Sequence, residues 1–161
     1  MTGVHGADGW DRPVVRRLYL ATKRAQELLG RAMAEEGATV ATWGALDALD
    51  RWDSAEGISQ AELATAVRVE QATMTVQVRK MLQCGLCERV PDSVDRRVRR
   101  ITITTRGREM LTRLRARAEE VEREMLAPLS ERQRDDLAAL LTVLAGQRRD
   151  RDKGTWPAAA R

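Results

Sequence analysis

The sequence has no phenylalanine, one tyrosine and four tryptophans, so aromatic residues make up only 3% of its 161 residues. A core must therefore be built from aliphatic side chains and methionine, which favours packed helices. No stretch approaches the roughly 18 consecutive apolar residues of a membrane helix. The opening residues, MTGVHGADGW, show no basic segment followed by an apolar run, as a secretory leader would. We therefore expect a globular protein in the cytoplasm.

Thiol and imidazole groups are nearly absent, since the chain holds two cysteines, Cys84 and Cys87, and one histidine, His5. Two cysteines are too few for a disulfide scaffold, and no second ligand pair completes a zinc site. The Cys-x-x-Cys spacing leaves thiol-based redox sensing open as an alternative. Neither a Gly-rich phosphate loop nor an HExxH motif occurs. We expect no enzyme and no cofactor.

Positive charge is present mainly as arginine, because lysine occurs only at Lys23, Lys80 and Lys153 within a net charge of +4. The guanidinium fork suits phosphates and guanine edges, so a nucleic-acid partner is permitted. A GC-rich genome would produce the same bias without any functional meaning. The placement of the arginines therefore matters more than their number.

The two ends of the chain show helical periodicity. From Val14 to Met33 apolar residues recur at steps of three and four, which predicts a long amphipathic helix that Gly37 ends. A second helix follows Thr39 or Thr42 and ends near Trp52. In the C-terminal part, Thr104 or Thr105 caps a long helix that stops at Pro128, and a Ser130-x-x-Gln133 capping box begins a last one.

The middle of the chain predicts a helix-turn-helix followed by a β-hairpin. Ser59 and Glu62 form a capping box for a short helix, residues 67–69 form a tight turn, and a second helix runs from Gln71 to Cys84, where Gly85 ends it. Two short helices this close together indicate a helix-turn-helix. The β-rich runs 86–90 and 98–103 then flank a basic tip. The predicted fold is mainly α, an α+β winged helix-turn-helix between long terminal helices.

Five short motifs within these predicted elements resemble those of a known protein family. The sequence resembles the multiple antibiotic resistance regulator (MarR) family in Leu63-Ala64, Ala72-Thr73-Met74-Thr75, Gly85-Leu86-x-Glu88-Arg89, Asp92-x-x-Asp95-Arg96-Arg97 and Ile103-Thr104-x-x-Gly107. The resemblance implies a homodimeric, sequence-specific DNA-binding transcription regulator, with repression as the expected mode. The expected organisation is a flexible arm at 1–11, N-terminal helices for dimerisation and the cleft at 12–52, the DNA-binding domain at 53–105, C-terminal dimerisation helices at 106–149 and a disordered tail at 150–161.

The start of the second short helix is the expected reading surface, because a helix in the major groove contacts bases with its N-terminal residues. Glutamine can pair with adenine, and Thr or Ala methyl groups can touch thymine. The alternative is the solvated face of an ordinary core helix. The expected contacts in the helix-turn-helix are Ser59, Gln71, Ala72, Thr73, Thr75, Val76 and Arg79.

In the hairpin, the resemblance assigns Arg97 to the minor groove, with Asp95 orienting it through an ion pair. A narrow minor groove concentrates negative potential, and Arg96, Arg99 and Arg100 add charge that phosphates would explain. The alternative is a solvated edge hairpin that charge guards against strand addition. The expected wing contacts are Asp95, Arg96, Arg97 and Arg99.

Two positions depart from the family pattern. Glu70 stands where the cap before the reading helix is usually Ser or Asp, and we expect it to cap the helix or to hold Arg68. Gln77 stands at a position that is commonly apolar. It is either an additional base or phosphate contact or a residue that loosens the packing of the helix.

The terminal helices carry more apolar surface than a wing domain can cover, which predicts a twofold dimer with two reading helices about 34 Å apart on a pseudo-palindromic operator. The resemblance also implies a small anionic or aromatic effector, for which Met33, Trp43 and Trp52 are candidate linings, although core packing is the commoner role of such residues. A winged-helix protein-interaction module without DNA readout remains the alternative function.

Overall fold

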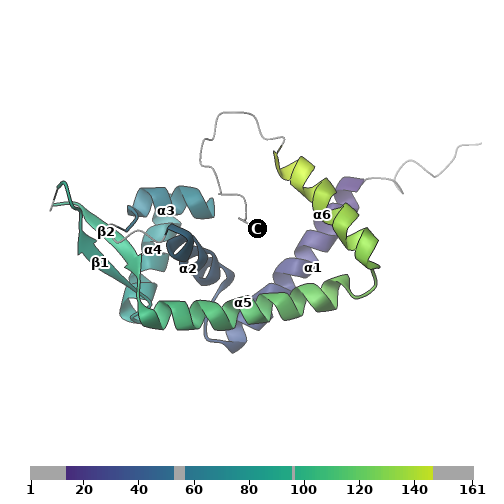
Figure 1. Cartoon of the computed structure of the whole chain (residues 1–161), viewed down its shortest axis with the longest axis horizontal. Helices are drawn as coiled ribbons and strands as arrows, with labels where there is room; N and C mark the ends of the chain where they lie inside the picture. The colour runs from purple at the N-terminus through teal and green to yellow at the C-terminus, as the bar shows by residue number, and fades with distance from the viewer. Residues whose placement is uncertain (1–13, 53–56, 96, 147–161) are drawn as a thin grey trace, which may run out of the picture.

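The computed structural model describes residues 14–52, 57–95 and 97–146. Its elements are α1 (Val14–Glu35), α2 (Val40–Trp52), α3 (Gln60–Val67), α4 (Gln71–Gln83), β1 (Cys87–Pro91), β2 (Arg99–Ile103), α5 (Thr105–Leu126) and α6 (Glu131–Gly146) (Figure 1). The predicted fold, helical with a small antiparallel hairpin, is confirmed. The predicted arm at 1–11 and tail at 150–161 lie outside the described residues. No helix within the described ranges is long and apolar enough to cross a membrane.

Side-chain caps explain where the helices begin. The Thr39 hydroxyl accepts the N–H of Thr42 at 3.1 Å, so Thr39 is the cap of α2. Ser59 and Glu62 form the predicted capping box of α3. Of the two candidates for α5, Thr104 is the cap, because its hydroxyl accepts the N–H of Gly107 at 3.0 Å. Each cap satisfies a backbone donor that the first helical turn leaves unpaired.

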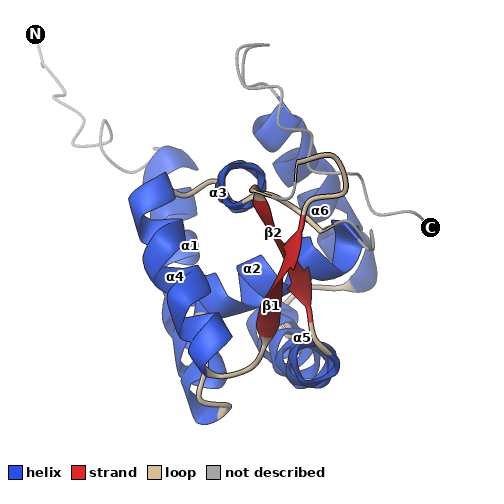
Figure 2. Ribbon diagram, turned by 90° about the vertical axis from the view of Figure 1, so that its left-hand side faces the viewer, coloured by secondary structure: helices blue, strands red, loops and turns tan. Residues whose placement is uncertain are grey.

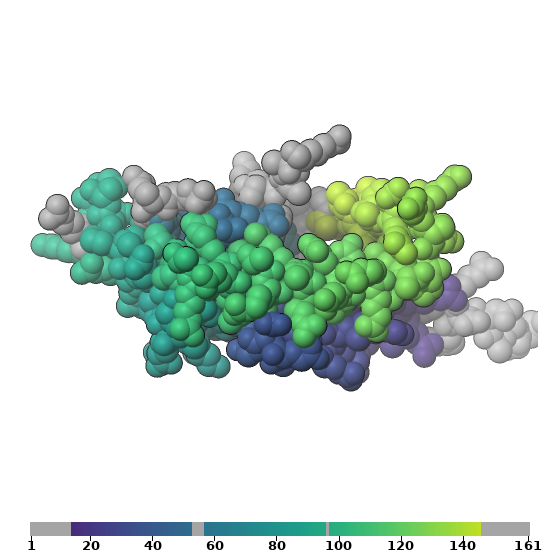
Figure 3. Space-filling model, turned by 60° about the horizontal axis from the view of Figure 1, so that its bottom comes forward, coloured from purple at the N-terminus to yellow at the C-terminus, as the bar shows by residue number. Residues whose placement is uncertain are grey.

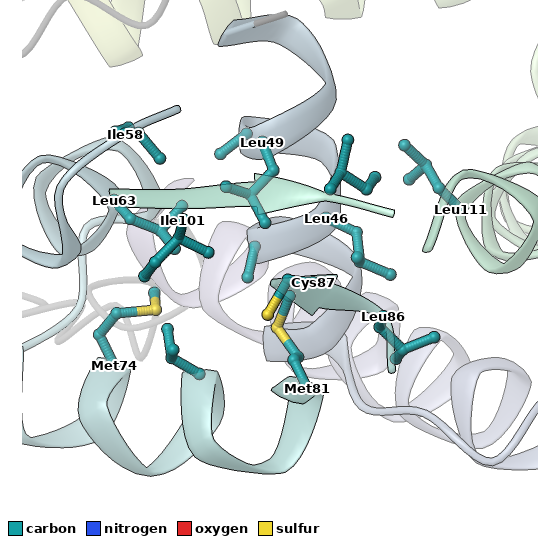
Figure 4. Close-up of a cluster of buried hydrophobic side chains, with 14 of the residues drawn as sticks. Leu46, Leu49, Ile58, Leu63, Met74, Met81, Leu86, Cys87, Ile101 and Leu111 are labelled. Atoms are coloured by element: carbon teal, nitrogen blue, oxygen red, sulfur yellow. The ribbon is translucent and has the colours of Figure 1, made fainter. Parts of the chain in front are cut away.

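One hydrophobic core joins α2, α3, α4, the hairpin and the first half of α5 (Figure 4). Leu46, Leu63, Met74 and Leu114 are at most 1% exposed within it. A bridge between Ile58 and Ile101 ties the segment before α3 to β2. The core thus fixes the positions of both helix-turn-helix helices and of the hairpin relative to each other.

The terminal helices extend away from this core. Figure 1 shows α1, α6 and the C-terminal half of α5 on the side opposite the hairpin. Figure 3 shows α5 running along the molecule from the winged region to the terminal helices. In α1 Met33 is the one buried side chain, and no described side chain of α6 is buried. The predicted apolar surplus is present as exposed side chains, among them Val14, Leu18, Leu20, Leu140, Leu141, Val143 and Leu144.

Candidate nucleic-acid interface

Helix α4 has a buried face and an exposed face. Its core side carries Met74, Val78 and Met81, which pack beneath the hairpin and α2. Figure 2 shows the hairpin with α4 beside it. The exposed side carries most of the predicted reading residues, namely Gln71, Ala72, Thr73, Val76 and Arg79. These side chains are therefore available to a ligand, and their contact with bases stays a prediction.

Thr75 and Ser59, the other two predicted contacts in the helix-turn-helix, are placed differently. Thr75 Oγ1 donates to the Gln71 carbonyl at 2.8 Å and accepts from Gln60 Nε2 at 2.6 Å. The Ser59 hydroxyl accepts the N–H of Glu62 at 3.2 Å. Both hydroxyls already hold protein partners: Thr75 holds α3 against α4, and Ser59 caps α3. Gln60, which the sequence did not indicate, is the partner on α3.

The turn between α3 and α4 corrects the expectation for Glu70. Glu70 occupies the cap position of α4, but its side chain makes no cap hydrogen bond. Within the described residues no ion pair joins it to Arg68 either. Arg68 itself is exposed and adopts a left-handed conformation with φ of 59°. The backbone N–H of Arg68 bonds the Thr65 carbonyl at 3.1 Å, so the turn is held by backbone groups.

Gln77 is a packing residue, so the structure gives it neither of the two expected roles, a base or phosphate contact or a residue that loosens the helix. Its side chain is 8% exposed, and Nε2 donates to the Thr42 hydroxyl at 2.8 Å across 35 positions of sequence. A buried amide with a partner is stable where an unpaired one would be costly. Gln77 therefore ties α4 to α2 and does not loosen the helix.

The hairpin is stabilised by an ion pair that the sequence did not predict. Asp92 is buried, with 8% of the residue exposed, and its carboxylate pairs with the Arg100 guanidinium. The same carboxylate accepts the N–H groups of Val94 at 2.8 Å and Asp95 at 3.0 Å. The N–H of Asp95, then Arg100 and the N–H of Val94 lower the pKa of Asp92 from 3.8 to about 2. The one signal in the sequence was Asp92 in the hairpin motif.

Arg100 also contacts the helix-turn-helix. Its Nη1 donates to the Gly57 carbonyl at 3.2 Å and lies 3.7 Å from Glu62 Oε2. Gly57 has a φ of +70°, and a Cβ there would meet the Ile101 carbonyl oxygen at 2.8 Å, so only glycine fits this close approach. Arg100 is thus turned toward the protein, which corrects the expectation that phosphates account for it.

The wing tip corrects the predicted Asp95–Arg97 ion pair. Within the described part of the hairpin, Asp95 Oδ1 accepts the backbone N–H of Arg97 at 2.9 Å, and no ion pair joins the two side chains. The tight turn uses the carboxylate to hold backbone, which leaves the guanidinium of Arg97 exposed. Arg99 on β2 is exposed as well. Arg96 lies outside the described residues.

A tight junction connects the wing to α5. The Thr104 hydroxyl donates to the Gly85 carbonyl at 2.7 Å, and the Thr104 N–H bonds the Leu86 carbonyl at 3.2 Å. A Cβ on Gly107 would lie 2.1 Å from the Leu86 carbonyl oxygen. This contact explains the glycine in the Thr-x-x-Gly motif, and it joins the end of α4, β2 and α5 at one point.

A cavity of about 700 Å³ lies between α1, α2, α5 and α6. Its wall is mostly apolar, and its charged members are Asp47, Arg51, Arg115, Glu119 and Glu122. Arg115 Nη2 lies 2.8 Å from Asp47 Oδ1. Trp43 lines it, and among the described side chains its buried indole Nε1 has no hydrogen-bond partner. The other two predicted linings lie elsewhere: Met33 is fully buried in the core, and Trp52 is 47% exposed off the cavity.

The cysteines do not have the chemistry of a redox pair. Cys84 is exposed at the end of α4, whereas Cys87 is buried on β1. Burial raises the pKa of the Cys87 thiol from 9.0 to about 11. Because the thiolate is the reactive form, Cys87 stays protonated at neutral pH, and this disfavours the redox alternative.

Comparison with known proteins shows what this chain is similar to. Residues 41–98 match the model of the MarR family. A 94-residue segment, 58% of this chain and 54% of the relative, is 35% identical to the transcriptional activatory protein BadR of Rhodopseudomonas palustris. The chain therefore spans about half the length of that curated relative.

Two solved structures are similar over most of the chain. A probable transcriptional regulator from Pseudomonas aeruginosa is 28% identical, with a TM-score of 0.71 over 83% of this chain and 98% of that one. A MarR family protein of Mycobacterium tuberculosis, solved in complex with DNA, is 25% identical, with a TM-score of 0.71 over 84% of this chain and all of that one, 100%.

Proposed function

We propose that this chain, whose residues 41–98 match the model of the MarR family, is a homodimeric transcription regulator that binds a pseudo-palindromic operator. The observation that carries the proposal is that the start of α4 and the arginines of the wing are both exposed. A reading helix in the major groove and arginines at the adjacent minor groove suit such an arrangement. The DNA complex of the similar mycobacterial protein supports it.

Selection of bound sites from random DNA tests the readout. We expect an enriched palindrome and an affinity that falls steeply with salt, because each neutralised phosphate releases counterions. Arg97→Ala should weaken binding to all sequences, whereas Gln71→Ala should relax the preference at particular bases. A flat salt dependence with no enriched sequence would favour the protein-interaction module instead.

The dimer follows from the unpartnered apolar faces of α1 and α6. Leu140 is 63% and Leu144 54% exposed in the single chain, and a twofold partner would cover such a surface. Light scattering should give twice the mass of 18.1 kDa. A Leu140→Asp, Leu144→Asp double variant should give the monomer, whereas Thr142→Asp, on the other side of α6, should leave the dimer intact. A monomeric wild type at micromolar concentration would contradict this part of the proposal.

The cavity is the proposed effector site, and a small anionic or aromatic molecule is the proposed effector. Its volume of about 700 Å³ is in the usual range for ligand pockets, and Trp43 is one of its lining residues. A panel of aromatic carboxylates should include compounds that raise the melting temperature and release DNA. Trp43→Phe should reduce that response, and Trp52→Phe, which lies off the cavity, should keep it.

We propose that the protein represses transcription. Its proposed location is the cytoplasm, where it associates with the nucleoid. A dimer that covers two successive half-sites would exclude polymerase from a promoter that contains the operator. The relative BadR is named as an activatory protein, so the direction needs its own test. A reporter behind the selected operator should fall in expression when the protein is present, and a rise would assign activation.

A further inference from the structure

We propose that Arg100 is a positioning residue that locks the wing to the start of α3, so that the wing arginine and the reading helix meet DNA as one unit. The inference rests on the proposed DNA-binding function and assigns a role that neither the family match nor the sequence pattern gives. Its basis is one chain of contacts that runs from the capping box of α3 to the tip of the hairpin.

The first half of that chain connects Arg100 to the helix-turn-helix. Glu62 accepts the N–H of Ser59 at 2.8 Å and caps α3. Its other contact is Arg100 Nη1 at 3.7 Å, and the same nitrogen donates to the Gly57 carbonyl at 3.2 Å. Arg100 therefore holds both the side chain that begins α3 and the backbone just before it.

The second half connects Arg100 to the tip. Arg100 Nε donates to Asp92, whose carboxylate also accepts the N–H groups of Val94 and Asp95. Asp95 in turn accepts the backbone N–H of Arg97. The position of the Arg97 backbone is thus fixed, through four side chains, to the N-terminus of α3.

The same contacts distinguish Arg100 from a phosphate-binding arginine. Its side chain is 26% exposed and faces two carboxylates and a carbonyl, whereas Arg97 and Arg99 are exposed. A guanidinium that binds two carboxylates adds little net attraction for DNA. Its effect on affinity should therefore pass through the wing.

Asp92→Asn gives the sharpest test, because a repelling role and a positioning role for Asp92 predict opposite changes in DNA affinity. Removing a negative charge beside DNA should strengthen binding if Asp92 only repels phosphates. Our proposal predicts weaker binding to the selected operator, by about threefold or more, because the lock to Arg100 is lost. The asparagine oxygen can still accept the N–H groups of the turn, so the hairpin should fold. Unchanged or tighter binding would overturn the inference.

A double-mutant cycle supplies a readout that a merely structural role would not move. Arg100→Met should weaken binding in the wild type but have little further effect in an Arg97→Ala background, since it acts through Arg97. Additive losses would show instead that Arg100 contacts DNA itself. Arg113→Met removes an α5 arginine that pairs with Glu36, outside the contacts that join α3 to the wing, and should leave the affinity unchanged.

Two further measurements complete the experiment. Glu62→Gln keeps a capping-box residue and should weaken binding less than Asp92→Asn, in line with the longer contact of 3.7 Å. A larger loss of affinity for Glu62→Gln than for Asp92→Asn would contradict the conclusion that Asp92 is the stronger partner of Arg100. If the wild type selects no DNA, the proposed function itself fails. If the wild type binds and Asp92→Asn binds as well, only the inference about Arg100 fails.

Discussion

The winged helix-turn-helix and the terminal helices bury their leucines to very different degrees. Leu63 on α3 is fully buried, whereas Leu140 on α6 is 63% exposed. The winged region packs around its own core. Helix caps, the bridge between Ile58 and Ile101 and the buried amide of Gln77 stabilise it. The terminal helices show an equally regular apolar pattern but lack a second surface to pack against within one chain. The comparison teaches that periodicity identifies an apolar face without saying which molecule covers it.

Truncation of one leucine in each region should give the largest contrast. Leu63→Ala should lower the free energy of unfolding by about 2–5 kcal/mol, because it leaves a cavity in a packed core. Leu140→Ala should cost little in a dilute monomer. In the proposed dimer it should lower the melting temperature, and by more at low protein concentration. Thermal unfolding at several concentrations measures both, and equal, concentration-independent losses would contradict the division.

Two glycines, one in the winged region and one in a terminal helix, test the same difference in packing. Gly107→Ala should destabilise the protein by about 1–3 kcal/mol, because the new methyl group would press on the Leu86 carbonyl. A methyl group added at Gly30 on α1 would meet nothing within 4 Å, so Gly30→Ala should instead stabilise by about 0.5–1 kcal/mol. Denaturant titration of the two variants should therefore shift in opposite directions. A shift in the same direction would argue against the close packing at the junction of wing and α5.

A smaller effect of favourable sign is expected in the turn between α3 and α4. Arg68 has a φ of 59°, a conformation that glycine adopts without steric cost. Arg68→Gly should raise the free energy of unfolding by about 0.5–1 kcal/mol, and Arg68→Val should lower it. Chemical denaturation compares the two. Equal stability of both variants would mean that the turn relaxes around the side chain.

An effect confined to acid is expected at Asp92. The pKa of Asp92 is lowered to about 2 from 3.8, so its contribution to stability is complete above the unfolded-state pKa and is lost as the pH falls from about 4 toward 2. Wild type should therefore lose more stability than Asp92→Asn over that interval, and the two should run parallel above pH 5. Thermal unfolding in a pH series measures the difference, and parallel curves throughout would contradict it.

Local chemistry made most of the fold predictable. Ser59 with Glu62, Thr104, Gly37 and Gly85 each act on their own backbone neighbourhood, so their roles can be deduced from spacing. Partners that lie far apart in the sequence could not be deduced in this way. Gln77 meets Thr42 across 35 positions, and Arg100 meets Gly57 across 43.

In the candidate site, too, local features could be predicted and long-range packing could not. The exposed positions of α4 follow from helical periodicity, and Trp43 lies on the cavity as proposed. Trp52 does not, because its position one turn past the packed part of α2 leaves it at the surface. Hydrophobic character alone could not separate the two tryptophans, since both fit the helix pattern and only the packing of α1 and α5 around α2 distinguishes them.

The junction at Thr104 and Gly107 has a mechanical consequence. Helix α5 has 22 residues and is therefore about 33 Å long, and its first turn is fastened to the wing and to the end of α4. It can act as a rigid lever whose far end lies among the terminal helices. A tilt of about 6° at that end would displace the wing by about 3 Å, close to the spacing of one base step. A small rearrangement around the cavity would thus be enough to shift the wing, and with it the end of α4, by about that distance.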